Sequence, residues 1–246
     1  MAATLALAAC SNPPASPPNE RKPACVDTDF EGSEFTDCVA VPGRHTIRTM
    51  LAGRDGQPYH DLGRLAEALG PRARHVVFAM NGGMYDEAGQ PIGYYVEAGK
   101  RVHRLNRVEG GGNFGMLPNG VFSVEGDRWR IRTADAFSAG VQTRPAFATQ
   151  SGPMLVIAGK LHPKIAANGT SLHVRNAVGI DSRGRAHFVI SNAAVSFGRL
   201  ARLMRDKLGC ANALYLDGSV SALWDPARER IDRTVPLGPL LVVERR

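Results

Sequence analysis

Short apolar runs separated by turn residues dominate this chain. Most runs end at a Gly, a Pro or an Asp-Gly pair, which is the pattern of β-strands joined by tight turns. Several neighbouring runs are separated by two or three turn residues and have the spacing of hairpins. The expected strands cover residues 35–40, 46–51, 76–80, 93–98, 101–105, 121–124, 129–131, 154–158, 174–180, 186–191, 214–216 and 239–243.

Two segments show helical periodicity instead. Residues 61–69 place apolar side chains on one stripe behind an N-cap, Asp61, and residues 196–208 do the same before Gly209, which suits a C-cap. Many strands with two helices predict an α+β fold, with a largely antiparallel or mixed β-sheet core and a few helices. No change in composition interrupts residues 30–246, so we expect one domain there.

The N-terminal segment has the order of elements found in lipoproteins. Residues 1–10 are apolar and end in Leu-Ala-Ala-Cys, a pattern in which a lipid-modified Cys10 becomes the mature N-terminus. Because this stretch is short and lacks a positive start, we interpret it as a truncated signal. The Pro-rich residues 11–29 are expected to form an extended tether. An apolar start that ends in Cys by chance is the alternative.

The charge pattern narrows the choice of partners. The formal net charge is +7, and the arginines are scattered rather than gathered in one run. A solvated surface, attraction to an anionic envelope and a preference for anionic substrates all fit this pattern, whereas a nucleic-acid-binding tail does not. Beyond residue 10 no apolar run approaches the ~18 residues that a membrane-spanning helix needs.

The cysteines bear on the compartment. Export implies an oxidising environment, in which Cys25, Cys38 and Cys210 are able to pair once Cys10 is lipidated. Three cysteines allow one disulfide, and the sequence leaves its partners open, with Cys25–Cys38 favoured because it closes a short loop. No Cys or His spacing suits zinc, so we expect neither a metal nor a cofactor.

Two glycine-containing motifs follow apolar strands. In Asn81-Gly82-Gly83, paired glycines allow neighbouring N–H groups to point outward together and bind an anion, although a simple tight turn fits equally. In Gln150-Ser151-Gly152, the amide and hydroxyl suit sugar hydroxyls, although the start of a strand explains the same residues.

Charged residues accompany two further strands. Arg175-Asn176 begins an apolar run, where a buried guanidinium requires either a phosphate or an internal salt bridge, for instance to Asp217. Asp217 itself ends a strand and suits a general acid, a nucleophile, an orienter of Arg175 or an Asx turn. His162 and His173 lie near the Gln150 and Arg175 segments along the chain and are kept as candidates.

Several familiar catalytic patterns are missing from the sequence. It contains neither a Gly-x-Ser-x-Gly elbow nor a His-Glu-x-x-His motif, and the triple glycine at 110–112 lacks the Lys of a phosphate-binding loop.

Together the motifs resemble those of the phosphodiester glycosidase family, in the same order along the chain. The matching stretches are residues 78–85, 118–122, 149–153, 175–179 and 216–221. The resemblance implies hydrolysis of a glycosyl phosphodiester, releasing a sugar from a phosphate-linked envelope or oligosaccharide substrate.

The resemblance also implies roles for particular residues. Asp217 would activate water or attack the anomeric carbon, with Arg175 and the N–H groups of Gly82 and Gly83 holding the phosphate. Glu97 is the expected second carboxylate. The remaining expected substrate-binding residues are Asn81, Asn119, Gln150, Ser151, Gly152, Asn176, Gly218, Ser219 and Ser221.

A protein without catalytic activity is the alternative. It would be a lipoprotein that binds envelope glycans or phosphate-containing polymers with the same residues. In both cases we expect a carbohydrate phosphodiester as partner, contact with the membrane through a lipid anchor at Cys10, no nucleic acid, and a location on the periplasmic or extracellular face of the bacterial envelope.

Overall fold

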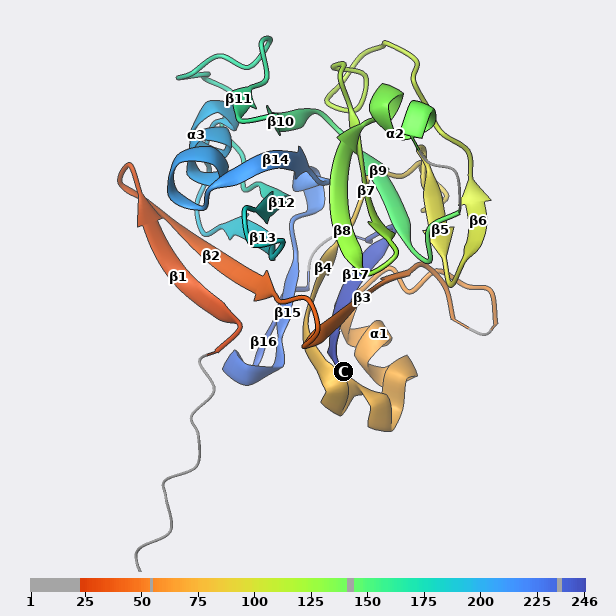
Figure 1. Ribbon diagram of the computed structural model, residues 1–246. Helices are drawn as coiled ribbons and strands as arrows, with labels where there is room; N and C mark the ends of the chain where they lie inside the picture. The colour runs from red at the N-terminus through yellow and green to blue at the C-terminus, as the bar shows by residue number, and fades with distance from the viewer. Residues whose placement is uncertain (1–22, 54, 141–143, 234–235) are drawn as a thin grey trace, which may run out of the picture.

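The computed structural model describes residues 23–53, 55–140, 144–233 and 236–246, which form three β-sheets with short helices at their margins (Figure 1). The seven-stranded sheet has the order β1 (Cys25–Phe30), β2 (Ser33–Ala40), β13 (Ala186–Ser191), β12 (Asn176–Asp181), β14 (Cys210–Tyr215), β10 (Met154–Ile157) and β11 (Lys160–Leu161).

The other two sheets have five strands each. One has the order β16 (Arg230–Ile231), β15 (Leu223–Asp225), β4 (Val76–Asn81), β17 (Leu240–Arg245) and β3 (His45–Met50). The other has the order β6 (Lys100–His103), β5 (Tyr95–Glu97), β9 (Ala148–Ser151), β7 (Gly120–Glu125) and β8 (Arg128–Thr133). All pairings between these strands are antiparallel.

The helices are short. They are α1 (Leu62–Leu69), α2 (Ala134–Gly140) and α3 (Phe197–Arg202), together with single turns η1 (Gly70–His75), η2 (Leu203–Lys207), η3 (Gly218–Val220) and η4 (Pro226–Arg228). The described residues include no helix long and apolar enough to cross a bilayer. The predicted α+β class with a largely antiparallel core is therefore confirmed.

One aromatic cluster joins the three sheets. Phe78 of β4, Phe122 of β7 and Phe188 of β13 are fully buried, and each comes from a different sheet. Phe188 meets Phe78 edge-on at 5.2 Å between ring centroids and Phe122 at 5.9 Å. Edge-to-face pairs of this kind add to the free energy gained by burying the rings. The core of the domain therefore lies where the three sheets meet.

Some predicted boundaries were wrong. Residues 25–29 were assigned to the tether, but they form most of β1, a strand whose polar residues carry little alternation. The predicted helix 196–208 is α3 followed by a π-helical turn, η2. Helix α2 and strands β9, β15 and β16 were missed, because each is short and lacks a clear apolar period.

The disulfide follows from the register of the first hairpin. Cys25 of β1 lies directly opposite Cys38 of β2, and the two sulfurs are bonded. The loop they close spans 13 residues in sequence. Cys210 is free and buried, and burial raises the pKa of its thiol well above the ordinary value.

This arrangement predicts the effect of removing the disulfide. The double substitution of Cys25 and Cys38 by Ala should lower the free energy of unfolding by about 3 kcal/mol, the chain-entropy value for a loop of this length. Urea unfolding followed by circular dichroism measures it. A reducing agent should destabilise the natural protein and leave the double variant unchanged. Equal stability of the two proteins under oxidising conditions would contradict the prediction.

Candidate functional site

The Asn81 side chain joins three segments that are far apart in sequence. It lies at the end of β4 and is fully buried. Its Nδ2 donates to the carbonyl of Asp217 at 2.7 Å, and its Oδ1 accepts from Asn176 Nδ2 at 2.7 Å and from the Ala222 N–H at 2.9 Å. Asn81 and Asn176 therefore build the site internally. Both side chains are buried, so neither lies at the surface to orient sugar hydroxyls as the sequence had suggested, although Asn176 Oδ1 has no partner among the described residues.

Asp217 is held by its backbone and presents its carboxyl group. It follows β14, its N–H donates to Gly82 at 3.1 Å, and its Oδ1 accepts from the Ser219 N–H at 3.2 Å. The residue is half-buried, and this burial raises the pKa of its carboxyl group. No ion pair within 4.0 Å in the described part of the chain involves it. Asp217 is thus a desolvated carboxylate without a cation partner, as catalytic carboxylates often are.

Two tyrosines that the sequence reasoning missed lie beside this carboxylate. Burial and the charge of Asp217 raise the pKa of Tyr85 to about 12, and its hydroxyl donates to the carbonyl of Pro236. Burial raises the pKa of Tyr215, and the charge of Asp217 adds to that effect. Tyr85 is the last residue of the matching stretch 78–85, and Tyr215 directly precedes the stretch 216–221, so their position beside these motifs is the signal that was available.

Arg175 lies beneath the site. Its side chain is 1% exposed, and its guanidinium stacks on Phe197 at 3.6 Å from the ring centroid. Nε donates to the carbonyl of Val195 at 2.9 Å, and Nη2 donates to the carbonyl of Ser171 at 3.0 Å. Both earlier interpretations of Arg175 therefore need correction, because so buried and bonded a group does not reach a phosphate, and Asp217 is not its ion-pair partner.

The charge of Arg175 acts on Tyr215, whose pKa it lowers against the larger effect of burial. No carboxylate lies within 4.0 Å of it among the described residues, and burial lowers the pKa of its guanidinium. Nη1 donates to the hydroxyl of Tyr215 at 3.2 Å. A Cβ atom at Gly218 would collide with that same hydroxyl, so the glycine allows the turn after Asp217 to pack directly on Tyr215. Arg175, Tyr215 and Gly218 form one continuous support for Asp217.

The paired glycines do not form an anion nest. The N–H of Gly82 donates to the carbonyl of Pro239 at 2.7 Å, and that of Gly83 donates to Thr149 Oγ1 at 3.2 Å. Neither is available to a phosphate. A Cβ atom at Gly83 would collide with the carbonyl oxygen of Gln150 in β9, so this position needs glycine for close packing between two sheets.

Gln150 and Asn119 form a second internal cluster. Gln150 Oε1 accepts from the N–H groups of Tyr94 at 2.7 Å and Asn106 at 3.0 Å, and its Nε2 donates to Asn119 Oδ1 at 3.1 Å. Both side chains are buried. They fix the loop that precedes β7, and their hydrogen-bonding groups are mostly used there instead of on a ligand.

The four segments therefore meet, but as a bonded network. Asn81 contacts both Asp217 and Asn176, and Gly83 packs on Gln150. A model of the phosphodiester glycosidase family matches residues 74–239, more than half of the chain and most of this network. The chain belongs to the phosphodiester glycosidase family.

Individual proteins are similar to this chain in sequence or in fold. The chain is 40% identical over 171 residues to a protein of Escherichia coli (strain K12) named Uncharacterized protein YigE; the match covers 70% of this chain and 66% of that protein. The fold is similar to the zebrafish N-acetylglucosamine-1-phosphodiester alpha-N-acetylglucosaminidase catalytic domain auto-inhibited by its pro-peptide, with a TM-score of 0.62 and 15% identity, covering 90% of this chain and 82% of that chain. It is also similar to a hypothetical protein from Synechocystis, with a TM-score of 0.54 and 16% identity, covering 90% of this chain and 61% of that one.

The expected second carboxylate lies elsewhere in this family member. Glu97 ends β5 and lines a separate cavity of about 400 Å³ that includes neither Asp217 nor Arg175. Its Oε2 accepts from the Tyr95 hydroxyl at 3.1 Å, and burial raises the pKa of its carboxyl group. Glu97 is therefore not part of the Asp217 site. The error arose because Glu97 is close in sequence to the Asn81 motif, whereas β5 leads away from it.

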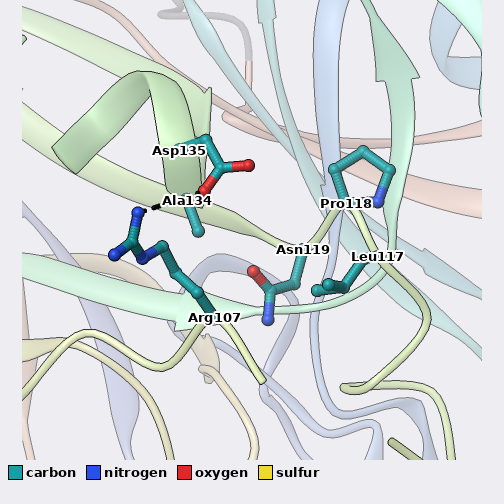
Figure 2. Close-up of a pocket in the computed structure, with 6 residues that line it drawn as sticks. All are labelled: Arg107, Leu117, Pro118, Asn119, Ala134 and Asp135. Carbon is teal, nitrogen blue, oxygen red and sulfur yellow. Dashed lines mark hydrogen bonds and ion pairs between the residues drawn. The ribbon is translucent and has the colours of Figure 1, made fainter. Parts of the chain in front are cut away.

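Another cavity, of about 240 Å³, adjoins the Gln150 cluster. Figure 2 shows Asn119, Leu117, Pro118 and Ala134 around it, with Arg107 facing Asp135. These two charged groups are 3.5 Å apart and largely exposed, so they interact weakly. Asn119 also binds Gln150, and the Gln150 backbone packs against Gly83. This cavity therefore adjoins the Asp217 network on the side of Gln150.

The remaining candidates take different positions. Ser219 is exposed, and the Ser221 hydroxyl donates to the carbonyl of Gly218 at 3.2 Å, so both surround the half-buried Asp217. Ser151 is fully buried, and its hydroxyl has no partner within the described residues. His162 is buried, with burial lowering its pKa, while His173 is exposed and bridges to Val195.

The Gly152 position is defined by packing. A Cβ atom there would approach the Asn119 side chain to 2.8 Å, so Gly152 allows the turn between β9 and β10 to lie against the amide cluster.

The raised pKa of Asp217 has a consequence for stability. A carboxyl group whose pKa is higher in the folded than in the unfolded state stabilises the fold below the unfolded pKa, and this contribution is lost as pH rises through the folded pKa. Asp217→Asn should therefore unfold at a higher urea concentration than the natural protein at pH 7. The difference between the two proteins should vanish below about pH 3.8, the ordinary pKa of an aspartate carboxyl group.

Asp206 provides a matched control, because its pKa is shifted in the opposite direction to that of Asp217. The hydrogen bond from Arg205 lowers the pKa of the Asp206 carboxyl group, so Asp206→Asn should not increase stability at pH 7. An unfolding midpoint of Asp217→Asn at or below that of the natural protein at pH 7 contradicts the burial argument.

Proposed function

We propose that the protein hydrolyses a glycosyl phosphodiester and that Asp217 acts at the anomeric carbon. The observation that supports this most is the carboxyl group of Asp217 itself, which is half-buried, held rigidly by its own backbone and free of any cation within 4.0 Å among the described residues. Membership of the phosphodiester glycosidase family supplies the class of reaction.

The proposed reaction breaks the bond between the anomeric carbon and the bridging oxygen. Water supplies a hydroxyl to the sugar, and the bridging oxygen leaves with the phosphate as a phosphomonoester. Because a phosphate oxygen leaves readily as an anion, the reaction needs little help from a general acid. One carboxylate then suffices, acting as a base on water or as a nucleophile that forms a glycosyl ester which water later cleaves.

Arg175 supports this chemistry from below. A buried positive charge acts over several ångströms, because the surrounding protein screens it less than water does. Arg175 lies behind Tyr215, and Tyr215 packs on the turn that carries Asp217. We assign Arg175 the roles of positioning that turn and favouring the negative charge of the substrate phosphate, without direct contact.

The cellular setting is a further part of the proposal. The apolar residues 1–10, ending in Cys10 and followed by a Pro-rich segment, support a lipid-anchored protein of the bacterial envelope. These residues lie outside the described part of the chain. The substrate would then be a sugar linked through phosphate to an envelope component or an oligosaccharide.

One observation favours the alternative of a binding protein. Glu97, the expected second carboxylate, lines a cavity whose lining does not include Asp217. A lipoprotein that only binds envelope glycans or phosphate-containing polymers would not need a second carboxylate. The experiment that separates the two is turnover by the purified protein.

Substitution of Asp217 tests the enzymatic proposal. The natural protein should release sugar from at least one member of a panel of nucleotide sugars and glycosyl phosphodiesters. Asp217→Asn should reduce kcat by about 10³-fold or more, since it removes the group that acts at the reacting carbon. Asp206→Asn, on the surface of η2, should leave kcat unchanged. Full activity of a folded Asp217→Asn variant rules out the proposed role.

The lipid anchor makes a separate prediction. When it is produced in a bacterial host behind a lipoprotein signal, the protein should sediment with the membranes and incorporate labelled fatty acid. Cys10→Ser should abolish the labelling and release the protein into the soluble fraction, because the thiol that carries the lipid is missing. Cys210→Ser is the control, since that thiol is buried in the fold. Labelling that persists in Cys10→Ser disproves the anchor.

A further inference from the structure

Strand register gathers arginines at one end of the β3–β17–β4 sheet. β17 ends at Arg245, which pairs with His45 at the start of β3, and Glu244 pairs with Val76 at the start of β4. Because neighbours in an antiparallel sheet run in opposite directions, the starts of β3 and β4 lie beside the end of β17. The turn η1 leads into β4 at this same end. The exposed arginines collected here, called the arginine end below, are Arg44, Arg48, Arg72, Arg74, Arg245 and Arg246.

Positive charge at the arginine end is only partly balanced. The buried Glu244 accepts from Arg48 at 2.6 Å and from Arg72 at 3.3 Å. None of the other four arginines has a carboxylate within 4.0 Å among the described residues. Burial is the largest cause that lowers the pKa of His45, and the positive charges of Arg44 and Arg245 lower it further. The end of the sheet therefore carries a positive potential suited to an anion.

A cavity of about 400 Å³ opens at the arginine end. Its lining includes three arginines, Arg48, Arg72 and Arg246. Trp129 of β8 and Phe147, both largely buried, form part of its wall. This volume is within the range of small-molecule sites. In Figure 1 the C-terminus lies beside β3 and α1, away from the loop that joins β14 to β15.

The lining specifies the class of ligand. Guanidinium groups match the geometry of phosphate oxygens and bind them through charge-assisted hydrogen bonds. An aromatic wall suits the apolar face of a sugar ring, and the Glu97 carboxyl group inside the cavity is able to accept from a hydroxyl. Burial raises the pKa of Glu97. At a pH just above the ordinary pKa of a carboxyl group, Glu97 is therefore less ionised than an exposed glutamate and repels an anion less.

We propose that the cavity at the arginine end is a second binding site, separate from Asp217, that takes a sugar phosphate of monosaccharide size. The site does not depend on the proposed hydrolysis, because none of its lining residues belongs to the Asp217 network. A protein without any catalytic activity would have the same site.

Calorimetric titration of the full protein with glucose 1-phosphate, glucose and inorganic phosphate tests the ligand class. Glucose 1-phosphate should bind at least about tenfold more tightly than either of the others, since only it uses both the arginines and the aromatic wall. Equal affinity for inorganic phosphate, or no binding of glucose 1-phosphate, overturns the proposal.

Variants locate the binding. Arg246→Gln should weaken binding of glucose 1-phosphate about tenfold through loss of a charge-assisted hydrogen bond. Arg246 has no carboxylate partner among the described residues, so its substitution should leave the fold intact; Arg72→Gln should act similarly, with Arg48 still bound to Glu244. Arg101→Gln, an exposed arginine on β6 outside the cavity, and Asp217→Asn should both bind normally. Binding that survives both cavity variants, or is lost in Asp217→Asn, places the ligand elsewhere and overturns the proposal.

The two tryptophans give an independent readout. In a two-dimensional NMR titration with glucose 1-phosphate, the indole N–H signal of Trp129 should shift, and that of Trp224 should not, because Trp129 lines the cavity and Trp224 lies in β15. A shift of Trp224 alone contradicts the assigned site.

Discussion

The buried amide of Asn81 is the interaction on which the site depends. A primary amide offers donors and acceptors in fixed directions, and Asn81 uses them to bind Asp217, Asn176 and Ala222 at once. Leaving such groups unpaired in the interior costs free energy, so the three segments are held to one arrangement. The carboxyl group of Asp217 owes its position to this amide, although Asn81 itself contacts only its backbone.

The same logic explains why these motifs of the chain are rich in small and amide residues. Gly83 and Gly218 are placed where a Cβ atom would collide with a neighbouring segment, and Gln150 connects loops that precede two different strands. Together these residues form a rigid frame around the half-buried carboxyl group of Asp217. Arg175 adds a positive charge without a carboxylate partner in the described structure, which an anionic substrate would complement.

The sequence predicted the strands well where apolar residues alternate or run together, as in β4, β13 and β17. It failed for β1, whose polar residues are held in the sheet by pairing with β2, and for β16, which is two residues long. It found which segments meet at the site, because their motifs were already recognisable. It could not tell that Arg175, Gly82 and Gly83 are engaged within the protein, nor that Glu97 lies in another cavity, because both depend on contacts between distant segments.

The Cys25–Cys38 bond also defines how the domain bears a mechanical load. Any pull through the residues before Cys25 reaches the fold at that residue and passes through the disulfide to Cys38 in β2, the second strand of a sheet of seven. Strand β1 cannot then be peeled from β2 starting at its first residue, because a covalent link closes that end of the hairpin. The force is instead shared by the ladder between β2 and β13, which must shear as a whole.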